Sequence, residues 1–299
     1  MPVLVDARRW RRAPAASLRR ARRAADRLGR RVAHDRPRLA GAALHGRERL
    51  RTVRARVRPR PPERPLERIV FELAQAVPDA TFVQVGAHDG TQLDPLREAI
   101  LGSRWRGVMV EPVPYVFARL ALRYGSHPRL ALENVAIADA DGVRPFHLLR
   151  QAEGDDDVWR WYDALGSFDR DVVLSHAHLV PDIAERLEVI EVTCLTFSSL
   201  CERHGIDRLD VVQIDTEGYD AEVLALIDLP RLRPRLVMYE HLHLDGQARA
   251  RCHALMAGHG FRLVSDGMDT LCLDDRALAL PGVRAAFDGA RTALAEVGA

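Results

Sequence analysis

The stretch Phe82-Val83-Gln84-Val85-Gly86-Ala87-His88-Asp89-Gly90 decides the interpretation of the fold. The apolar run 81–85 has the length of a buried strand and leads directly into Gly86. The Gly86-x-x-x-Gly90 loop that follows provides a tight turn, a close backbone approach and the start of a helix. It is neither GxGxxG nor a P-loop, which would end in GK[ST]. By itself the loop therefore predicts a strand-to-helix turn or an unspecified nucleotide site.

Strand-like and helix-like segments alternate through the chain from Leu66 onward. The expected strands are 81–85, 107–110, 130–136, 209–214 and 236–239, with a closing pair at 261–265 and 270–273 and strand-like segments at 143–149 and 187–193. The expected helices are 66–76, 93–101, 116–124, 197–204, 221–227 and 247–259. This alternation predicts an α/β fold, with a mostly parallel sheet and helices on both faces.

Ligands of such sheets bind outside the carboxyl ends of the strands. Gly86–Gly90, Glu111, Asp215 and the pair Glu240-His241 all follow expected strands. We therefore expect them to face one crevice.

Glu111 narrows the choice of ligand. It ends the second expected strand, where an acidic side chain can accept both hydroxyls of a ribose. A glycine loop together with this acid indicates a ligand that contains adenosine. The central glycine that a dinucleotide pyrophosphate requires is missing, which favours S-adenosylmethionine (SAM) over NAD. The alternative is that Glu111 only caps a surface turn.

Three blocks of sequence resemble the FkbM-type SAM-dependent methyltransferases. They are the 82–90 stretch, the block Gly107-Val108-Met109-Val110-Glu111-Pro112-Val113-Pro114, and the block Asp210-Val211-Val212-Gln213-Ile214-Asp215-Thr216-Glu217-Gly218-Tyr219-Asp220. The blocks keep the order and spacing of that family, and the resemblance covers roughly residues 80–275.

The resemblance implies a class I, Rossmann-like methyltransferase fold, whose seven-stranded sheet ends in an antiparallel pair. It also implies methyl transfer, usually to a hydroxyl oxygen of a natural product or carbohydrate. Many members have Asp at the position of Gln84, which can still hydrogen-bond the SAM amino group but without charge attraction. The remaining implied contacts are Gly86, Ala87 and Gly90 at the methionine part, Glu111 at the ribose, and Asn134 to Ala136 near the adenine.

Removal of the acceptor proton has two candidate arrangements. Asp215, Glu240 and His241 form an oxygen and nitrogen cluster suited to Mg²⁺ or a related divalent ion. Without a metal, His241, His243 or His176 acts as general base and Asp215 orients it. The expected catalytic residues are therefore Asp215, His241 and His176. Glu217 has a structural alternative as a cap for the helix that begins near Tyr219-Asp220.

Charge divides the 299 residues into two parts, although the net charge is only +2. Residues 1–60 contain 20 arginines against four acidic residues, and every basic residue of the chain other than histidine is Arg. We expect an Arg-rich extension with a Pro-rich linker over 1–66 and a methyltransferase domain over 67–299. An insert at about 150–188 would form a lid that carries Trp159, Trp161 and Tyr162.

The remaining expectations concern partners and location. The four cysteines show no metal-ligand spacing and indicate buried or free thiols, and the absence of a signal peptide favours the cytoplasm. The acceptor would be a small molecule or a glycan. The basic arm is expected to be a solvated extension, with contact to nucleic acid or an anionic surface as the alternative, and a homo-oligomer is left open. Rival functions are an NAD-dependent oxidoreductase, disfavoured because the chain has neither GxGxxG nor any Lys, and a non-catalytic protein that binds a polyanion through the arm.

Overall fold

The structure, a computed structural model, describes residues 62–91, 94–150, 165–178, 180 and 182–297. The arginine-rich segment 1–61 and the predicted aromatic cluster of Trp159, Trp161 and Tyr162 lie outside these residues. Within the described ranges, no helix is both long enough and apolar enough to cross a membrane.

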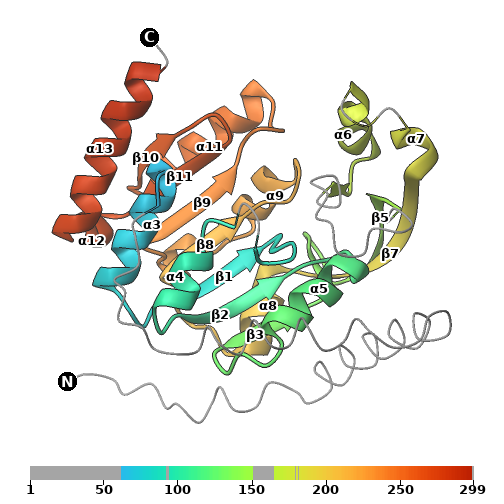
Figure 1. Cartoon of the computed structure of the whole chain (residues 1–299), viewed down its shortest axis with the longest axis horizontal. Helices are drawn as coiled ribbons and strands as arrows, with labels where there is room; N and C mark the ends of the chain where they lie inside the picture. Colours follow the sequence, from blue (N-terminus) through green and yellow to red (C-terminus); the bar gives the residue numbers. More distant parts are fainter. Residues whose placement is uncertain (1–61, 92–93, 151–164, 179, 181, 298–299) are drawn as a thin grey trace, which may run out of the picture. The chain divides into compact units, whose positions relative to one another are not determined.

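Seven strands form the main sheet (Figure 1). They are β1 (Thr81–Val85), β2 (Arg106–Val110), β3 (Leu130–Glu133), β8 (Val211–Ile214), β9 (Leu236–Glu240), β10 (Arg262–Ser265) and β11 (Asp269–Leu273). The strand order is β10-β11-β9-β8-β1-β2-β3. Pairing is parallel from β9 to β3, and β11 is antiparallel to both of its neighbours. The expected mostly parallel sheet with a closing antiparallel pair is confirmed.

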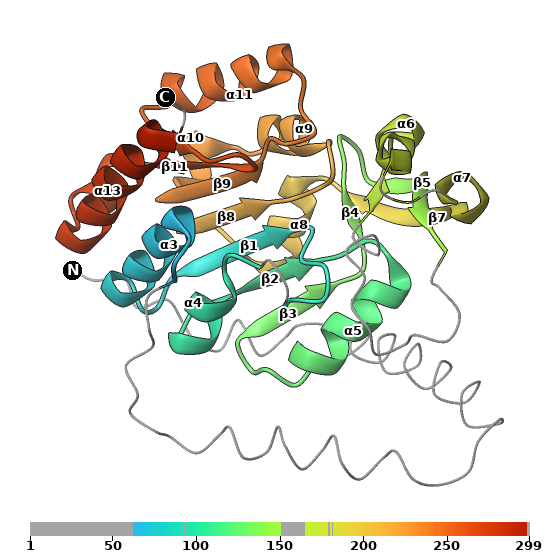
Figure 2. The same cartoon turned by 45° about the horizontal axis from the view of Figure 1, so that its top comes forward.

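Helices cover both faces of this sheet (Figures 1 and 2). The core on one face contains side chains of α8, α9 and α11 together with those of β1 and β8, while α3 packs along α13. Helix α13 was not predicted, although its buried residues Val283, Phe287 and Ala290 recur at helical spacing. The helices of this domain are α3 (Pro65–Ala76), α4 (Arg97–Gly102), α5 (Pro114–Tyr124), α8 (Phe197–His204), α9 (Asp220–Ala225), α10 (Leu229–Leu232), α11 (Gly246–Gly258), α12 (Asp275–Leu278) and α13 (Pro281–Val297).

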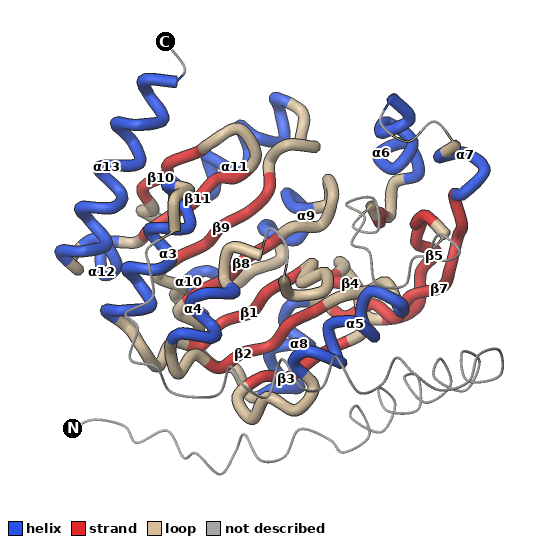
Figure 3. The backbone as a smooth tube through the Cα atoms, in the orientation of Figure 1, coloured by secondary structure: helices blue, strands red, loops and turns tan. Residues whose placement is uncertain are grey.

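A second, smaller sheet stands apart from the first in the tube view (Figure 3). Its strands β4 (Ala136–Ile137), β5 (Gly142–Leu149), β6 (Gly166–Ser167) and β7 (Leu187–Leu195) have the order β4-β7-β5-β6. The single strand expected over 130–136 is therefore two strands in two sheets. The Asn134 side-chain amide donates to the carbonyl oxygens of Glu111 at 2.8 Å and Pro112 at 2.9 Å, which fixes the corner between them.

The predicted insert connects two strands, β5 and β7, which pair over the whole length of β5. β5 and β7 are antiparallel from Gly142 opposite Cys194 to Leu149 opposite Leu187. The insert thus ends at about residue 186, because Leu187 already belongs to β7. Its described part holds β6, α6 (Arg170–Leu174), the 3-10 turn η4 (Ser175–His178) and α7 (Ile183–Arg186).

All four cysteines are buried free thiols, as the sequence predicted. They come from β7, α8, α11 and β11. Burial raises the pKa of each thiol, to about 11 for Cys201 and Cys252. They act as small apolar side chains of the core.

Gly86 sits where three strands meet. β1 has β2 on one side and β8 on the other, which is the point where strand order reverses and ligands of such folds bind. The Gly86 N–H donates to the Val110 carbonyl oxygen at 3.0 Å, and the Asp215 N–H donates to the Val85 carbonyl oxygen at 2.9 Å. Gly86 has φ +79°, and a Cβ there would lie 1.6 Å from the Asp215 carbonyl oxygen. Only glycine fits this position.

We expect Gly86→Ala to lower the melting temperature by at least about 2–8 °C, because left-handed backbone costs an L-residue about 1–2 kcal/mol before the clash is added. Gly102→Ala is the matched control, since a Cβ on Gly102 meets no atom within 4 Å. Thermal unfolding of both variants checks this. Equal melting temperatures would show that the close approach is not required.

Candidate functional site

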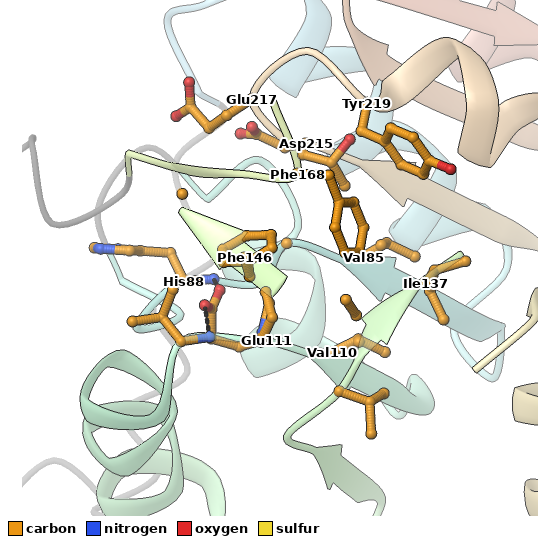
Figure 4. Close-up of a pocket in the computed structure, with 17 residues that line it drawn as sticks. Val85, His88, Val110, Glu111, Ile137, Phe146, Phe168, Asp215, Glu217 and Tyr219 are labelled. Atoms are coloured by element: carbon orange, nitrogen blue, oxygen red, sulfur yellow. Dashed lines mark hydrogen bonds between the residues drawn. The ribbon is translucent and has the colours of Figure 1, made fainter. Parts of the chain in front are cut away.

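A pocket of about 620 Å³, part of it open to solvent, lies at the carboxyl ends of β1, β2 and β8 (Figure 4). Of the residues expected to face one crevice, Gly86, Glu111 and Asp215 line this pocket, whereas Gly90, Glu240 and His241 are not among its lining residues. His88 and Glu111 lie on one side in Figure 4, while Asp215 and Glu217 lie on the other. Aromatic rings separate them: Phe168 makes edge contacts with Phe146 at 5.2 Å and with Tyr219 at 5.0 Å between ring centroids.

Glu111 is held rigidly at the end of β2. Its Oε1 accepts from the Val113 N–H at 2.8 Å and its Oε2 from the His88 N–H at 3.0 Å. The residue is only 6% exposed, and this burial raises its pKa to about 7. His88 has φ +46°, so the loop is strained where it meets Glu111. The buried Nε2 of His88 has no hydrogen-bond partner among the described residues.

The predicted adenine region is apolar. Val135, Ala136 and Ile137 line the pocket beside Val110 and Val113. Ala136 therefore lines the pocket, and its contact with adenine stays a prediction. The Asn134 amide instead braces the backbone around Glu111.

Two other predicted cofactor contacts, Ala87 and Gly90, belong to the glycine loop but are not among the residues that line the pocket. Ala87 is buried, and its N–H donates to the Val110 carbonyl oxygen at 2.9 Å. Gly90 packs against Tyr124, whose hydroxyl donates to the Gly90 carbonyl oxygen at 2.8 Å. Both residues shape the loop around Gly86.

Gln84 is buried in β1 and hydrogen-bonds the carboxylate of Asp94, which was not predicted as part of the site. Its Nε2 donates to Asp94 Oδ1 at 2.9 Å. Burial raises the pKa of Asp94. The predicted contact between Gln84 and the SAM amino group stays a prediction, and the structure adds an acid ten residues later to the same neighbourhood.

The loop after β8 is held in an unusual conformation. Glu217 has φ +51° and Gly218 has φ +96°. Asp220 is fully buried, and its carboxylate accepts from the Thr216 hydroxyl at 3.0 Å and the Gly218 N–H at 3.2 Å. Burial raises the pKa of Asp220 to about 7. The alternative role of Glu217 as a helix cap does not hold, because α9 begins at Asp220 without a side-chain cap.

Glu217 instead points to a cluster of histidines. Its Oε2 lies 3.1 Å from His243 Nε2, and this hydrogen bond raises the pKa of His243. The ring centroids of His176 and His243 are 5.0 Å apart. The nearest ligand-type atoms of His176, Glu217 and His243 all lie within 4.8 Å of one another. We call these three residues the histidine cluster.

The predicted metal set of Asp215, Glu240 and His241 needs a correction. His241 turns its Nδ1 to the Thr270 hydroxyl at 2.9 Å, and burial lowers its pKa. His243, two residues later, is the histidine that lies beside Glu217 and Glu240. Glu240 is buried with its Oε2 3.8 Å from His243 Nε2, so it adjoins the cluster.

Of the predicted catalytic residues, Asp215 lines the pocket and His176 belongs to the cluster. Burial and the neighbouring Glu217 carboxylate raise the pKa of Asp215 well above its usual range. Sequence reasoning underrated Glu217 and missed Phe146 as a lining residue. For Glu217, the available signal in the sequence was its place in the Asp-x-Glu-Gly block.

Glu111 predicts how stability changes with pH. Its pKa is about 4.5 when unfolded and about 7 when folded, so the folded state binds more protons between these values. The free energy of unfolding should therefore fall as pH rises through this window, by up to roughly 3 kcal/mol. Glu111→Gln should reduce that fall, whereas Glu98→Gln, at an exposed position of α4, should leave it unchanged. Denaturant titrations from pH 5 to pH 8 test this, and an identical pH dependence in Glu111→Gln would contradict it.

Known proteins resemble the chain in sequence and in fold. It is 28% identical over 149 residues to the 2-O-methyltransferase NoeI of Sinorhizobium fredii (strain NBRC 101917 / NGR234), covering 50% of this chain and 57% of that protein. The chain thus spans little more than half the length of this curated relative.

Two solved structures are similar at low identity. One is the methyltransferase FkbM from Methylobacillus flagellatus KT, with a TM-score of 0.41, 13% identity and coverage of 65% of this chain and 43% of that one. The other is the O-methyltransferase TomG from Streptomyces achromogenes in complex with SAM, with a TM-score of 0.37, 15% identity and coverage of 86% and 88%.

The family comparison is the broadest in sequence. The methyltransferase FkbM domain matches residues 84–263, which is more than half of the chain and runs from β1 to β10. The matched range contains Glu111, the Asp215–Asp220 loop and the histidine cluster. The protein belongs to the FkbM methyltransferase family.

Proposed function

We propose that the protein transfers a methyl group from SAM to a hydroxyl oxygen of a carbohydrate or natural product. The family assignment supports methyl transfer, and the name of the relative NoeI, a 2-O-methyltransferase, supports oxygen as the acceptor atom. The observation that carries the proposal is Glu217. It lines the pocket and also contacts His243, so one residue joins the cofactor crevice to a group that can accept a proton.

The pocket suits SAM on its own geometry. Gly86 lines the pocket, and the buried Nε2 of His88 has hydrogen-bonding capacity to offer. Glu111 presents two carboxylate oxygens that would take the ribose hydroxyls. The apolar wall of Val135, Ala136 and Ile137 would pack on the adenine.

When bound, SAM supplies an electrophilic methyl group on a sulfonium. The protein has to place the acceptor hydroxyl in line and help it lose its proton, because the pKa of an alkyl hydroxyl lies far above 7. Phe168 and Tyr219 flank the side of the pocket where Asp215 and Glu217 lie, and would pack on the acceptor. The proton would leave toward Glu217 and His243.

Calorimetry with SAM, S-adenosylhomocysteine and NAD tests the cofactor. SAM and S-adenosylhomocysteine should bind, and Glu111→Gln should weaken both by about 10- to 100-fold through loss of charge-assisted hydrogen bonds. Glu98→Gln is the matched control and should bind normally. Binding of NAD without SAM would indicate an oxidoreductase, and binding of none of the three would favour a non-catalytic protein.

The acceptor class is tested by methyl transfer from labelled SAM to oligosaccharides and hydroxylated natural products. Products should carry the label as an O-methyl ether. Label found only on nitrogen or carbon atoms would overturn O-methylation.

A further inference from the structure

The histidine cluster is assembled from three distant parts of the chain. His176 lies in η4 of the insert, Glu217 in the loop after β8, and His243 just after β9. Their ligand-type atoms still converge to within 4.8 Å. Convergence of this kind depends on the tertiary fold, and a local run of polar residues does not account for it.

Glu240 provides a second and independent observation. Its side chain is 92% buried, yet its Oε2 has no hydrogen-bond partner among the described residues and lies 3.8 Å from His243 Nε2. A buried carboxylate oxygen without a partner is costly and calls for an explanation such as an unseen ion. It lies beside the cluster and is aimed at the same imidazole as Glu217.

The backbone at Glu217 is strained, and neighbouring hydrogen bonds hold it in that conformation. Its left-handed φ of +51° is unfavourable for a residue with a Cβ, and the buried Asp220 clamps the loop on both sides of it. His176 is oriented as well, because its Nδ1 lies 3.2 Å from the Val172 carbonyl oxygen. Because a carbonyl oxygen can only accept, that contact favours the proton on Nδ1 of His176.

From this geometry we propose that His176, Glu217 and His243, with Glu240 as an adjoining ligand, bind one divalent transition-metal ion. Two imidazoles with carboxylate oxygens suit Zn²⁺, Fe²⁺ or Co²⁺, whereas Mg²⁺ prefers oxygen ligands alone. The site therefore differs from the sequence expectation in its ligands and in its metal.

The position of the site suggests its use, and this part rests on the proposed function. Glu217 and its neighbour Asp215 line the cofactor pocket on the side away from Glu111. A cation held by Glu217 would face the acceptor hydroxyl and lower its pKa. In that arrangement Glu217 and His243 are metal ligands, and the proton of the acceptor hydroxyl would leave to Asp215, which lines the same side of the pocket.

The test uses the full chain after dialysis against EDTA. Calorimetry with ZnCl₂ should show one equivalent bound, and addition of CoCl₂ should produce visible absorption bands typical of Co²⁺ in a protein site. MgCl₂ should bind far more weakly than either. No binding of Zn²⁺ or Co²⁺ would overturn the inference.

Variants separate this site from chance binding elsewhere. His176→Asn, Glu217→Gln and His243→Asn should each weaken Zn²⁺ binding by more than about 10-fold, since loss of even an outer-shell partner costs that much. His178→Asn is the matched control, because His178 lies in the same turn but is exposed. Equal Zn²⁺ affinity in the control and the three cluster variants would also overturn the inference.

SAM binding measured on the same samples keeps the two proposals apart. Cluster variants that still bind SAM are folded, so their loss of Zn²⁺ is specific. SAM binding without any metal binding removes the metal site and leaves the methyltransferase proposal standing. Metal binding without SAM binding removes the methyltransferase proposal and leaves the metal site standing.

Discussion

The backbone contact between the β1 loop and the β8 loop sets the geometry of everything around the pocket. Gly86 is squeezed between the carbonyl oxygens of Val110 and Asp215, and a Cβ there would lie 1.6 Å from the latter. Because these two loops touch, the Glu111 side and the Glu217 side of the pocket stand at a fixed separation. A larger residue would push β8 away from β1 and widen the crevice. The contact thus determines where the two halves of the site face each other.

Hydrogen bonds hold a glutamate in place on each side of this contact. On one side, backbone N–H groups of His88 and Val113 hold Glu111, and the Asn134 amide holds the backbone beneath it. On the other side, Asp220 holds the loop of Glu217. Each side buries a carboxyl group whose pKa rises as a result. Strained or buried groups of this kind persist where the surrounding structure over-determines them, which is typical of functional sites.

The sequence was most informative where structure is local. The bounds of β1 match the expected strand, and Glu111 and Asp215 lie at strand ends as expected, because apolar runs and strand-end acids follow from neighbouring residues. The choice between His241 and His243 was not local. The choice depends on Thr270 of β11, whose hydroxyl hydrogen-bonds the His241 ring. It also depends on the left-handed turn that brings Glu217 to His243. Tertiary contacts between distant segments leave no periodic signal in the sequence.

The four buried cysteines have a practical consequence. A thiol reagent can modify them only when the segment that covers each one opens, since the thiols are buried and their pKa values are raised. Cys194 belongs to the small sheet, Cys272 to the main sheet, and Cys201 and Cys252 to helices packed on it. Their labelling rates would therefore rank the opening of these parts separately. The four native cysteines would thus report which part of the structure opens first.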